Sequence, residues 1–289
     1  NFNIIVATAL RDRKYILVST SIDYCGRFLL LSFFWVKLHI NLEIVIGIIS
    51  FAIISNTSYL LIRYRKKLSY IEIYSAKSTF FDSLNFCWPM MVWGIFGWAQ
   101  AMSGRWFLDS FVSLEVVAIY GIMVSLATLP VNAIVGVATT YLYPIIYQID
   151  FKNPAASKQY ILRTILYLIP PCFCLLLFTY FYHSNIIELF SSPKYSLFSQ
   201  YLPLMLLASL SSGLSSILCG LSYVKRHASS LLFANIIPGM CAFIFGYFLI
   251  ERFQLKGAVI IFVVVNFIAS FLYIVAFIKQ SMHLKTDIA

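Results

Sequence analysis

The sequence predicts an all-α integral membrane protein, and two observations carry that prediction. Of the 289 residues, 61% are hydrophobic and only 11% are charged, whereas a soluble domain is about 45–50% apolar and about 25% charged. The apolar residues also form runs long enough to cross a bilayer, whose hydrocarbon core of about 30 Å needs roughly 20 helical residues. Since lipid offers the backbone no hydrogen-bond partner, we expect these long runs to be helices and not barrel strands.

Eight apolar runs meet the length, with almost no soluble linker between them: 15–36, 42–62, 81–103, 112–143, 159–182, 198–222, 229–250 and 257–278. About eight transmembrane helices are therefore predicted. The pair Pro170-Pro171 predicts a sharp break in the fifth of them, because proline removes a backbone hydrogen bond. Gly213, flanked by serines, predicts a close helix–helix contact in the sixth.

The lysines and arginines predict the orientation of these helices. Fifteen of the 21 fall on one side of the alternating loops, five fall on the other, and Arg27 lies within a helix. Because cytoplasmic loops are enriched in lysine and arginine, both termini are predicted to be cytoplasmic. The net charge of +10 is mostly this topological signal, so no nucleic-acid partner is predicted.

Few polar residues lie inside the predicted spans, and each is costly there. Asp23 and Arg27 are four residues apart on one helix face and can pair directly; a buried structural ion pair and a role in a transport cavity both remain open. Four asparagines are predicted mainly to form hydrogen bonds between helices: Asn85, Asn132, Asn235 and Asn266.

The stretch GIFGWAQAMSGRWFLDSF (94–111) places Gln100, Arg105 and Asp109 in an apolar helix. One interpretation is an arginine that extends to the membrane surface beside Trp106, which is typical of an interfacial residue. The other is an arginine that projects into a cavity and binds a phosphate group bidentately. Both interpretations fit the sequence.

No enzyme motif is present. The four histidines are far apart, and neither H-E-x-x-H, nor G-x-S-x-G, nor a phosphate-binding glycine loop occurs. The six cysteines all lie in apolar runs, where cysteine usually acts as a small hydrophobic residue. We therefore expect no catalytic residue, no disulfide, no metal and no cofactor.

Residues 88–147 carry a more specific pattern. Pro89 is followed by Gly97-Trp98, by the segment SGRWFL (103–108), by EVVAIY (115–120) and by Tyr143-Pro144 at the end of a long helix. This order resembles the start of the second half of the Wzx-type polysaccharide flippases, in the multidrug/oligosaccharidyl-lipid/polysaccharide (MOP) exporter superfamily. Gly104 stands where that family commonly has aspartate, so the resemblance implies that Arg105 has no charge partner there or pairs with Asp109.

The resemblance implies a MATE-like flippase fold, with twelve helices in two six-helix lobes, of which this chain would hold the last eight. Residues 1–62 would be the last two helices of the N-terminal lobe. Residues 63–80 would be a basic, amphipathic inter-lobe linker, although a solvated basic loop explains that segment equally well. Residues 81–289 would be the complete C-terminal lobe with a short cytoplasmic tail.

The function that the resemblance implies is the flipping of an undecaprenyl-diphosphate-linked oligosaccharide across the bacterial inner membrane, by alternating access, for O-antigen or capsule biosynthesis. The lipid-linked oligosaccharide, the bilayer and other polysaccharide-assembly membrane proteins would be the partners. Substrate-binding candidates are Arg27 and Arg105, with Asp23, Asp109 and Gln100 beside them. The alternatives are a multidrug/cation antiporter of the same superfamily and a membrane glycosyl polymerase or ligase.

Overall fold

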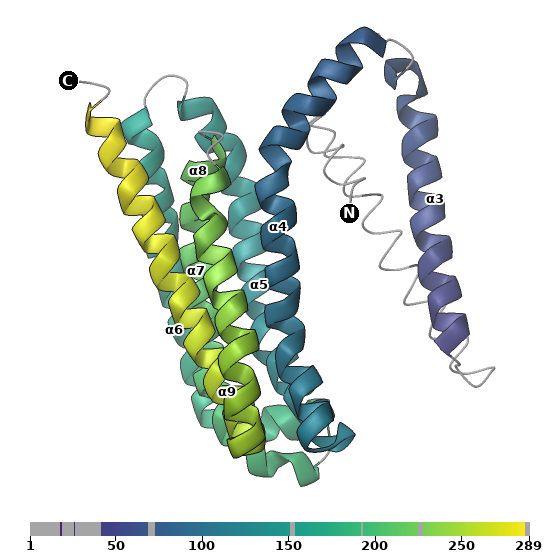
Figure 1. Ribbon diagram of the computed structural model, residues 1–289, viewed down its shortest axis with the longest axis vertical. Helices are drawn as coiled ribbons and strands as arrows, with labels where there is room; N and C mark the ends of the chain where they lie inside the picture. The colour runs from purple at the N-terminus through teal and green to yellow at the C-terminus, as the bar shows by residue number, and fades with distance from the viewer. Residues whose placement is uncertain are drawn as a thin grey trace. The chain divides into compact units, whose positions relative to one another are not determined.

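The computed structural model describes residues 18, 26, 42–68, 73–150, 154–191, 193–224 and 228–286, and these residues form helices and short turns without a strand. The chain divides into two compact units, residues 1–81 and 82–289. The helices are α3 (Leu42–Leu68), α4 (Ile73–Phe111), α5 (Leu114–Asp150), α6 (Pro154–Phe190), η1 (Pro193–Tyr201), α7 (Leu202–Ser216), η2 (Ile217–Cys219), α8 (Gly220–Val224), η3 (Ala228–Leu231) and α9 (Leu232–Thr286). Within the second unit, α5, α6, α7 and α9 form a bundle of long, roughly parallel or antiparallel helices (Figure 1).

Four helical stretches in the described part of the chain are long and apolar enough to cross a membrane: Leu114–Ile149, Ala156–Phe190, Tyr195–Val224 and Ser229–Ser281. Apart from residues 112 and 113, which form the turn before α5, they contain the five spans predicted from residue 112 onward. The predicted spans 42–62 and 81–103 fall in α3 and α4, which are helical but are not among the four. Trp, Gly, Ser and Gln residues dilute the hydropathy of α4. The span 15–36 lies outside the described residues, so the count of eight remains a prediction.

The long helix α9 is a hairpin of two membrane-length helices. Gln254 has φ 50° and ψ −127°, which are not helical. Contacts are symmetric about it: the Tyr273 hydroxyl donates to Asn235 Oδ1 at 2.8 Å, and Gln280 Nε2 donates to Ser230 Oγ at 2.6 Å. The chain therefore reverses at Gln254, between the predicted spans 229–250 and 257–278.

The prediction of a sharp break at Pro170-Pro171 is wrong in its position. Both prolines lie inside α6, and the one residue there with non-helical dihedrals is Tyr182, at φ −116° and ψ 17°. In a membrane helix the backbone groups that proline leaves free can find other partners, so the helix can continue through the two prolines. α6 changes direction nearer to its C-terminal end.

A polar seam joins α7 to the second half of α9; we define it as Ser211, Ser212, Ser215, Asn266 and Ser270. Ser211 Oγ donates to Ser270 Oγ at 2.9 Å, Ser215 Oγ lies 2.6 Å from the same hydroxyl, and Ser212 Oγ donates to Asn266 Oδ1 at 2.7 Å. On α7, Gly213 makes the predicted close contact with a different helix: a Cβ there would lie 2.5 Å from Val131 Cγ1 on α5. Interhelical hydrogen bonds are therefore confirmed for Asn266 and, within the α9 hairpin, for Asn235, while Asn85 and Asn132 are exposed.

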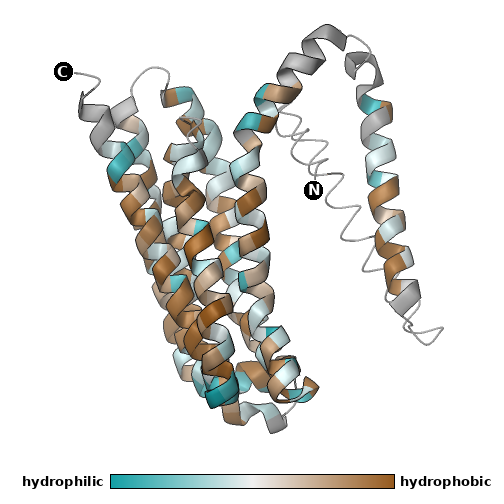
Figure 2. Ribbon diagram, in the orientation of Figure 1, coloured by the Kyte–Doolittle hydropathy of each residue, from teal (hydrophilic) through white to brown (hydrophobic). Residues whose placement is uncertain are grey.

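The buried core of the second unit lies where α5, α6, α7 and α9 meet the end of α4, and it includes Leu108, Met123, Met205 and Ile250. The helices of the bundle are apolar over much of their length (Figure 2), and many of their large apolar side chains are exposed on the outside. Tyr167 on α6 is 75% exposed, and Phe233 on α9 is 71% exposed. Outer faces of this kind are stable in lipid and unfavourable in water.

Candidate functional site

The predicted site residues fall into two groups. Asp23 and Arg27 lie outside the described residues, so their role remains a prediction. Gln100, Arg105 and Asp109 all lie on α4, where Gln100 and Arg105 are half-buried and Asp109 is exposed. No interaction of Gln100 with the other two side chains is found in the described part of the chain.

Arg105 is held by a close contact between α4 and α5. Gly104 packs against Tyr120, because a Cβ at position 104 would lie 2.7 Å from Tyr120 Oη and 2.8 Å from its Cε1. Both Gly104 and Tyr120 are buried. Next to this contact, the Arg105 side chain passes over Gly121, where a Cβ would lie 3.9 Å from Arg105 Nε. The two glycines therefore leave room for one tyrosine ring and one guanidinium group at the same level of the bundle.

The guanidinium of Arg105 has one buried donor without a partner. Its Nε is buried and makes no hydrogen bond within the described structure. Arg105 forms no ion pair with Asp109 among the described residues, so the pairing that could have replaced the missing aspartate at position 104 is not made. A buried donor without a partner is unfavourable, and such a group is suited to bind an acceptor from outside the protein.

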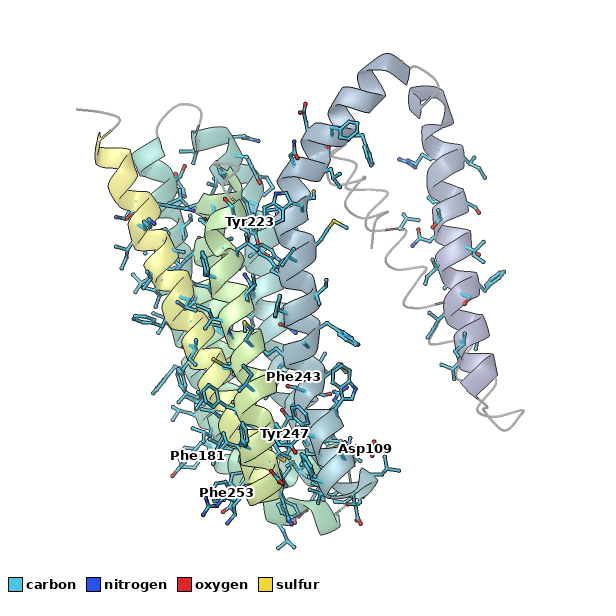
Figure 3. The ribbon with its side chains drawn as sticks, viewed as in Figure 1. Asp109, Phe181, Tyr223, Phe243, Tyr247 and Phe253 are labelled. Atoms are coloured by element: carbon cyan, nitrogen blue, oxygen red, sulfur yellow. The ribbon has the colours of Figure 1, made fainter. Side chains whose placement is uncertain are left out.

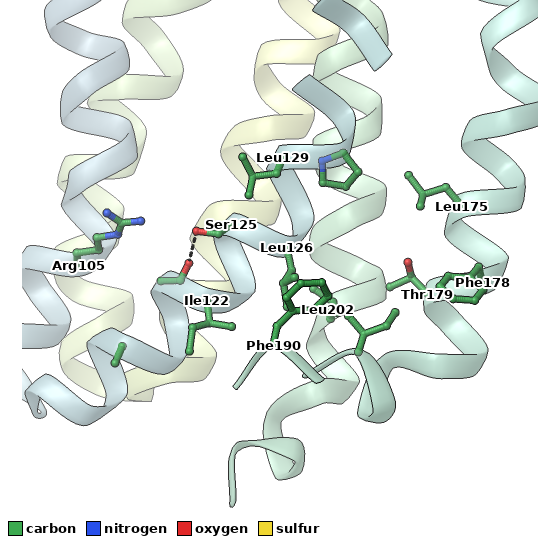
Figure 4. Close-up of a pocket in the computed structure, with 14 residues that line it drawn as sticks. Arg105, Ile122, Ser125, Leu126, Leu129, Leu175, Phe178, Thr179, Phe190 and Leu202 are labelled. Atoms are coloured by element: carbon green, nitrogen blue, oxygen red, sulfur yellow. Dashed lines mark hydrogen bonds between the residues drawn. The ribbon is translucent and has the colours of Figure 1, made fainter. Parts of the chain in front are cut away.

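Arg105 points into the bundle and not to its surface. Figure 4 shows its side chain leaving α4 toward the turn of α5 that carries Ser125. Its neighbour Trp106 is 40% exposed and contacts Trp98 edge to face, with ring centroids 5.0 Å apart. The tryptophans thus lie at the periphery, as interfacial residues do, while the arginine turns inward.

The space that Arg105 reaches is a cavity of about 690 Å³ between α4, α5, α6 and the start of α7. Arg105 is the one charged residue among those that line it. Two hydroxyl groups join it, those of Ser125 and Thr179, and Ser125 Oγ already donates to the Gly121 carbonyl at 2.8 Å. The rest of the lining is glycine or apolar side chains, chiefly Leu126, Leu129, Leu175, Phe178, Ile186 and Phe190. The cavity therefore combines one cation with a hydrocarbon wall.

An aromatic cluster covers α4 and the first half of α9 near the same end of the bundle (Figure 3). Phe107 contacts Phe243 at 5.3 Å and Tyr247 at 5.8 Å between ring centroids, and Phe111 contacts Tyr247 at 5.2 Å. These rings fix α4 against α9 and so hold the turn of α4 that carries Arg105.

The residues that sequence reasoning missed are Tyr120, Gly121 and Thr179. Tyr120 closes the EVVAIY segment, so a signal for it was present in the sequence. Gly121 and Thr179 carry no such signal, because their role depends on which turn of α5 and α6 faces Arg105. Among the described residues, no group of three His, Cys, Asp or Glu side chains could hold a metal ion.

Taken together, apolar membrane-length helices and an inward-facing arginine define an all-helical integral membrane protein with a cation-bearing cavity. The chain belongs to the polysaccharide biosynthesis protein family, whose model matches residues 2–150. That match covers α3, α4 and α5 and thus includes Arg105, Tyr120 and all of the α5 wall of the cavity. No curated protein and no solved structure matches the chain.

Proposed function

We propose that this protein moves an oligosaccharide linked to undecaprenyl diphosphate across the bacterial inner membrane, as a Wzx-type flippase for O-antigen or capsule biosynthesis. The observation that carries the proposal is the position of Arg105. In this member of the polysaccharide biosynthesis protein family, a guanidinium with an unpaired donor lines a cavity of the membrane bundle. Guanidinium binds phosphate oxygens bidentately, and the diphosphate is the charged part of such a lipid-linked sugar.

The sign of the charge favours this cargo over a cationic drug. A cation antiporter needs a carboxylate in its site, whereas the cavity lining contains Arg105 and no Asp or Glu. Asp109, the nearest acid along α4, is exposed. A positively charged cavity attracts an anionic group and repels a cationic one.

The proposed architecture is the MATE-like arrangement of two lobes. The predicted helix 15–36 and α3 would be the last two helices of the N-terminal lobe, and residues 81–289 would form the C-terminal lobe that carries Arg105. Rocking of the two lobes would expose the cargo first to the cytoplasm and then to the outside, as in alternating access. The protein would be a transporter and not an enzyme, with both termini in the cytoplasm and other polysaccharide-assembly membrane proteins as its partners.

A transport assay with arginine variants tests the proposal. The full chain is reconstituted into phosphatidylcholine vesicles with a fluorescent polyprenyl-diphosphate oligosaccharide, and flipping is read as the fraction of label that an external quencher reaches. Arg105→Ala is expected to reduce the rate by about tenfold or more, because a charge-assisted hydrogen bond to phosphate is lost. Arg105→Lys keeps the charge but not the bidentate geometry, so its flipping rate is expected to lie between the rates of the wild type and of Arg105→Ala.

Arg252→Ala is the matched control. Arg252 is exposed and contacts the ring of its neighbour Phe253 at 5.8 Å, so its removal should leave the rate unchanged. Arg27→Ala tests the second predicted arginine in the same assay. Wild-type rates in both Arg105→Ala and Arg27→Ala would refute the phosphate-binding site, and growth of the oligosaccharide in the vesicles would instead indicate a polymerase.

A further inference from the structure

The lining of the Arg105 cavity is too apolar for a sugar. Ser125 and Thr179 are the uncharged polar side chains among its fourteen residues, and the Ser125 hydroxyl is already used within α5. A sugar ring carries several hydroxyl groups, and burial of each without a hydrogen bond is unfavourable. An occupant of this cavity must therefore be mainly hydrocarbon.

The wall opposite Arg105 is suited to a hydrocarbon chain. This part of the lining contains Leu126 and Leu129 from α5, Leu175 and Phe178 from α6, and Phe190 near the end of α6 (Figure 4). Some of this wall reaches the surface of the bundle: Leu129 is 64% exposed and Phe190 is 65% exposed. In a membrane that surface contacts lipid, so a chain that starts beside Arg105 can continue between α5 and α6 into the bilayer.

We infer that this cavity binds the lipid end of a phosphate-headed amphiphile, with the phosphate at Arg105 and the first part of the hydrocarbon chain between α5 and α6. The inference rests on the proposed function for the identity of the amphiphile as the polyprenyl carrier, and it places the glycan outside the cavity. At about 690 Å³ the space is within the usual range for small-molecule sites, about 300–1,000 Å³. It accommodates a few isoprene units, and a longer chain extends beyond it.

Photolabelling tests the position of the chain. The full chain is placed in phosphatidylcholine nanodiscs with farnesyl diphosphate that carries a diazirine on its terminal isoprene, and labelled peptides are mapped by mass spectrometry. Label is expected on α5 and α6 within the cavity lining. Leu129→Trp fills the mouth of the cavity and should reduce this label several-fold. Val137→Trp is the matched control, because Val137 lies two turns further along α5 at 75% exposure, outside the lining.

The positions labelled in the wild-type protein test the inference by themselves, so the test does not depend on the folding of a variant. Label spread evenly over the outer faces of the bundle, or label that Leu129→Trp and Val137→Trp reduce equally, would overturn the inference. Arg105→Ala is expected to raise the farnesyl diphosphate concentration for half-maximal labelling about tenfold or more, since one charge-assisted contact is removed.

Competition with unlabelled compounds shows which kind of molecule occupies the cavity. Unlabelled farnesyl diphosphate should displace the probe, farnesol and inorganic diphosphate should each do so much more weakly, and phosphatidylglycerol added to the nanodisc should not. Displacement by inorganic diphosphate at equal concentration would show that the hydrocarbon wall contributes nothing. Displacement by phosphatidylglycerol would make the cavity a site for bilayer lipid and not for the carrier. Specific labelling of a protein that fails to flip the oligosaccharide would refute the proposed function while the inferred lipid site stands.

Discussion

Gly104 of α4 lies against the ring of Tyr120 of α5, so closely that a methyl group at position 104 would come within 2.7–2.9 Å of three ring and hydroxyl atoms. The Wzx-type pattern commonly has aspartate at this position, and here the tyrosine occupies the space that such a side chain would need. The contact sets the distance between α4 and α5 at the level of Arg105. The Gly104–Tyr120 contact leaves no room for an acidic side chain at position 104, and it lies next to the point where Arg105 turns toward α5.

Gly104→Ala is therefore expected to destabilise the protein by roughly 1–3 kcal/mol, the usual cost of overpacking a buried position. It should also reduce transport, because α4 and Arg105 must shift. Thermal unfolding in nanodiscs measures the first effect. Gly97→Ala on the same helix is the control: nothing lies within 4 Å of a Cβ there, and the higher helix propensity of alanine makes that variant neutral or slightly stabilising. Equal melting temperatures for the two variants would contradict the packing argument.

The Ser270 hydroxyl is the centre of the polar seam, because it contacts Ser211 Oγ and Ser215 Oγ and also donates to the Ser211 carbonyl at 3.2 Å. Ser270→Ala should lower stability by about 0.6 kcal/mol and by no more than about 1.7 kcal/mol, the average and the maximum measured for hydrogen bonds between membrane helices. Ser110→Ala removes an exposed hydroxyl that bonds only within α4, to the Trp106 carbonyl, and should change little. A double-mutant cycle of Ser270→Ala with Ser211→Ala checks the coupling; additive losses would show that the two serines act independently.

The sequence predicts the helices well because hydropathy alone decides which segments leave water. The run 159–182 lies inside α6, and the run 112–143 lies inside α5 from Leu114 onward, for this reason. The reversal between 250 and 257 is also foreseeable, since Glu251, Arg252 and Lys256 interrupt the apolar run. The bend at Tyr182 coincides with the end of the predicted span 159–182, where His183, Ser184 and Asn185 interrupt the apolar run, although the run alone does not show that the helix bends there and does not end.

The direction of Arg105 could not be predicted from its neighbours. An arginine beside Trp106 suits a membrane surface and a cavity equally, and α4 alone does not decide between them. The contact of Gly104 with Tyr120 decides, and it joins residues from two helices. The apolar character of the cavity is a tertiary property in the same way, since its walls come from α5 and α6.

Gln254 adopts dihedrals close to those of the first central residue of a type II′ turn, a position that favours glycine. Because a side chain is strained at positive φ, Gln254→Gly is expected to stabilise the α9 hairpin by roughly 1 kcal/mol. Glu251→Gly is the control of opposite sign: Glu251 is exposed in regular helix, and glycine there costs about 1 kcal/mol. Chemical unfolding measures the free energy of unfolding of both variants. A loss of stability in Gln254→Gly would show that the glutamine side chain contributes to the turn.

Gly239 of α9 lies against the backbone of α4, where a Cβ would come within 2.7 Å of the Phe96 carbonyl oxygen and 2.8 Å of Phe96 Cβ. Because backbone atoms cannot move aside as a flexible side chain can, Gly239→Ala should separate the two helices and cost roughly 1–3 kcal/mol of stability. Gly246→Ala, two turns further along α9, meets only ordinary contacts at 3.5 Å with the Phe107 ring and should be tolerated. Melting temperatures in nanodiscs compare the two. Since the same contact holds α4 and therefore Arg105, Gly239→Ala should also weaken farnesyl diphosphate labelling, whereas intact labelling in a destabilised protein would show that Arg105 is positioned by Tyr120 and the aromatic cluster alone.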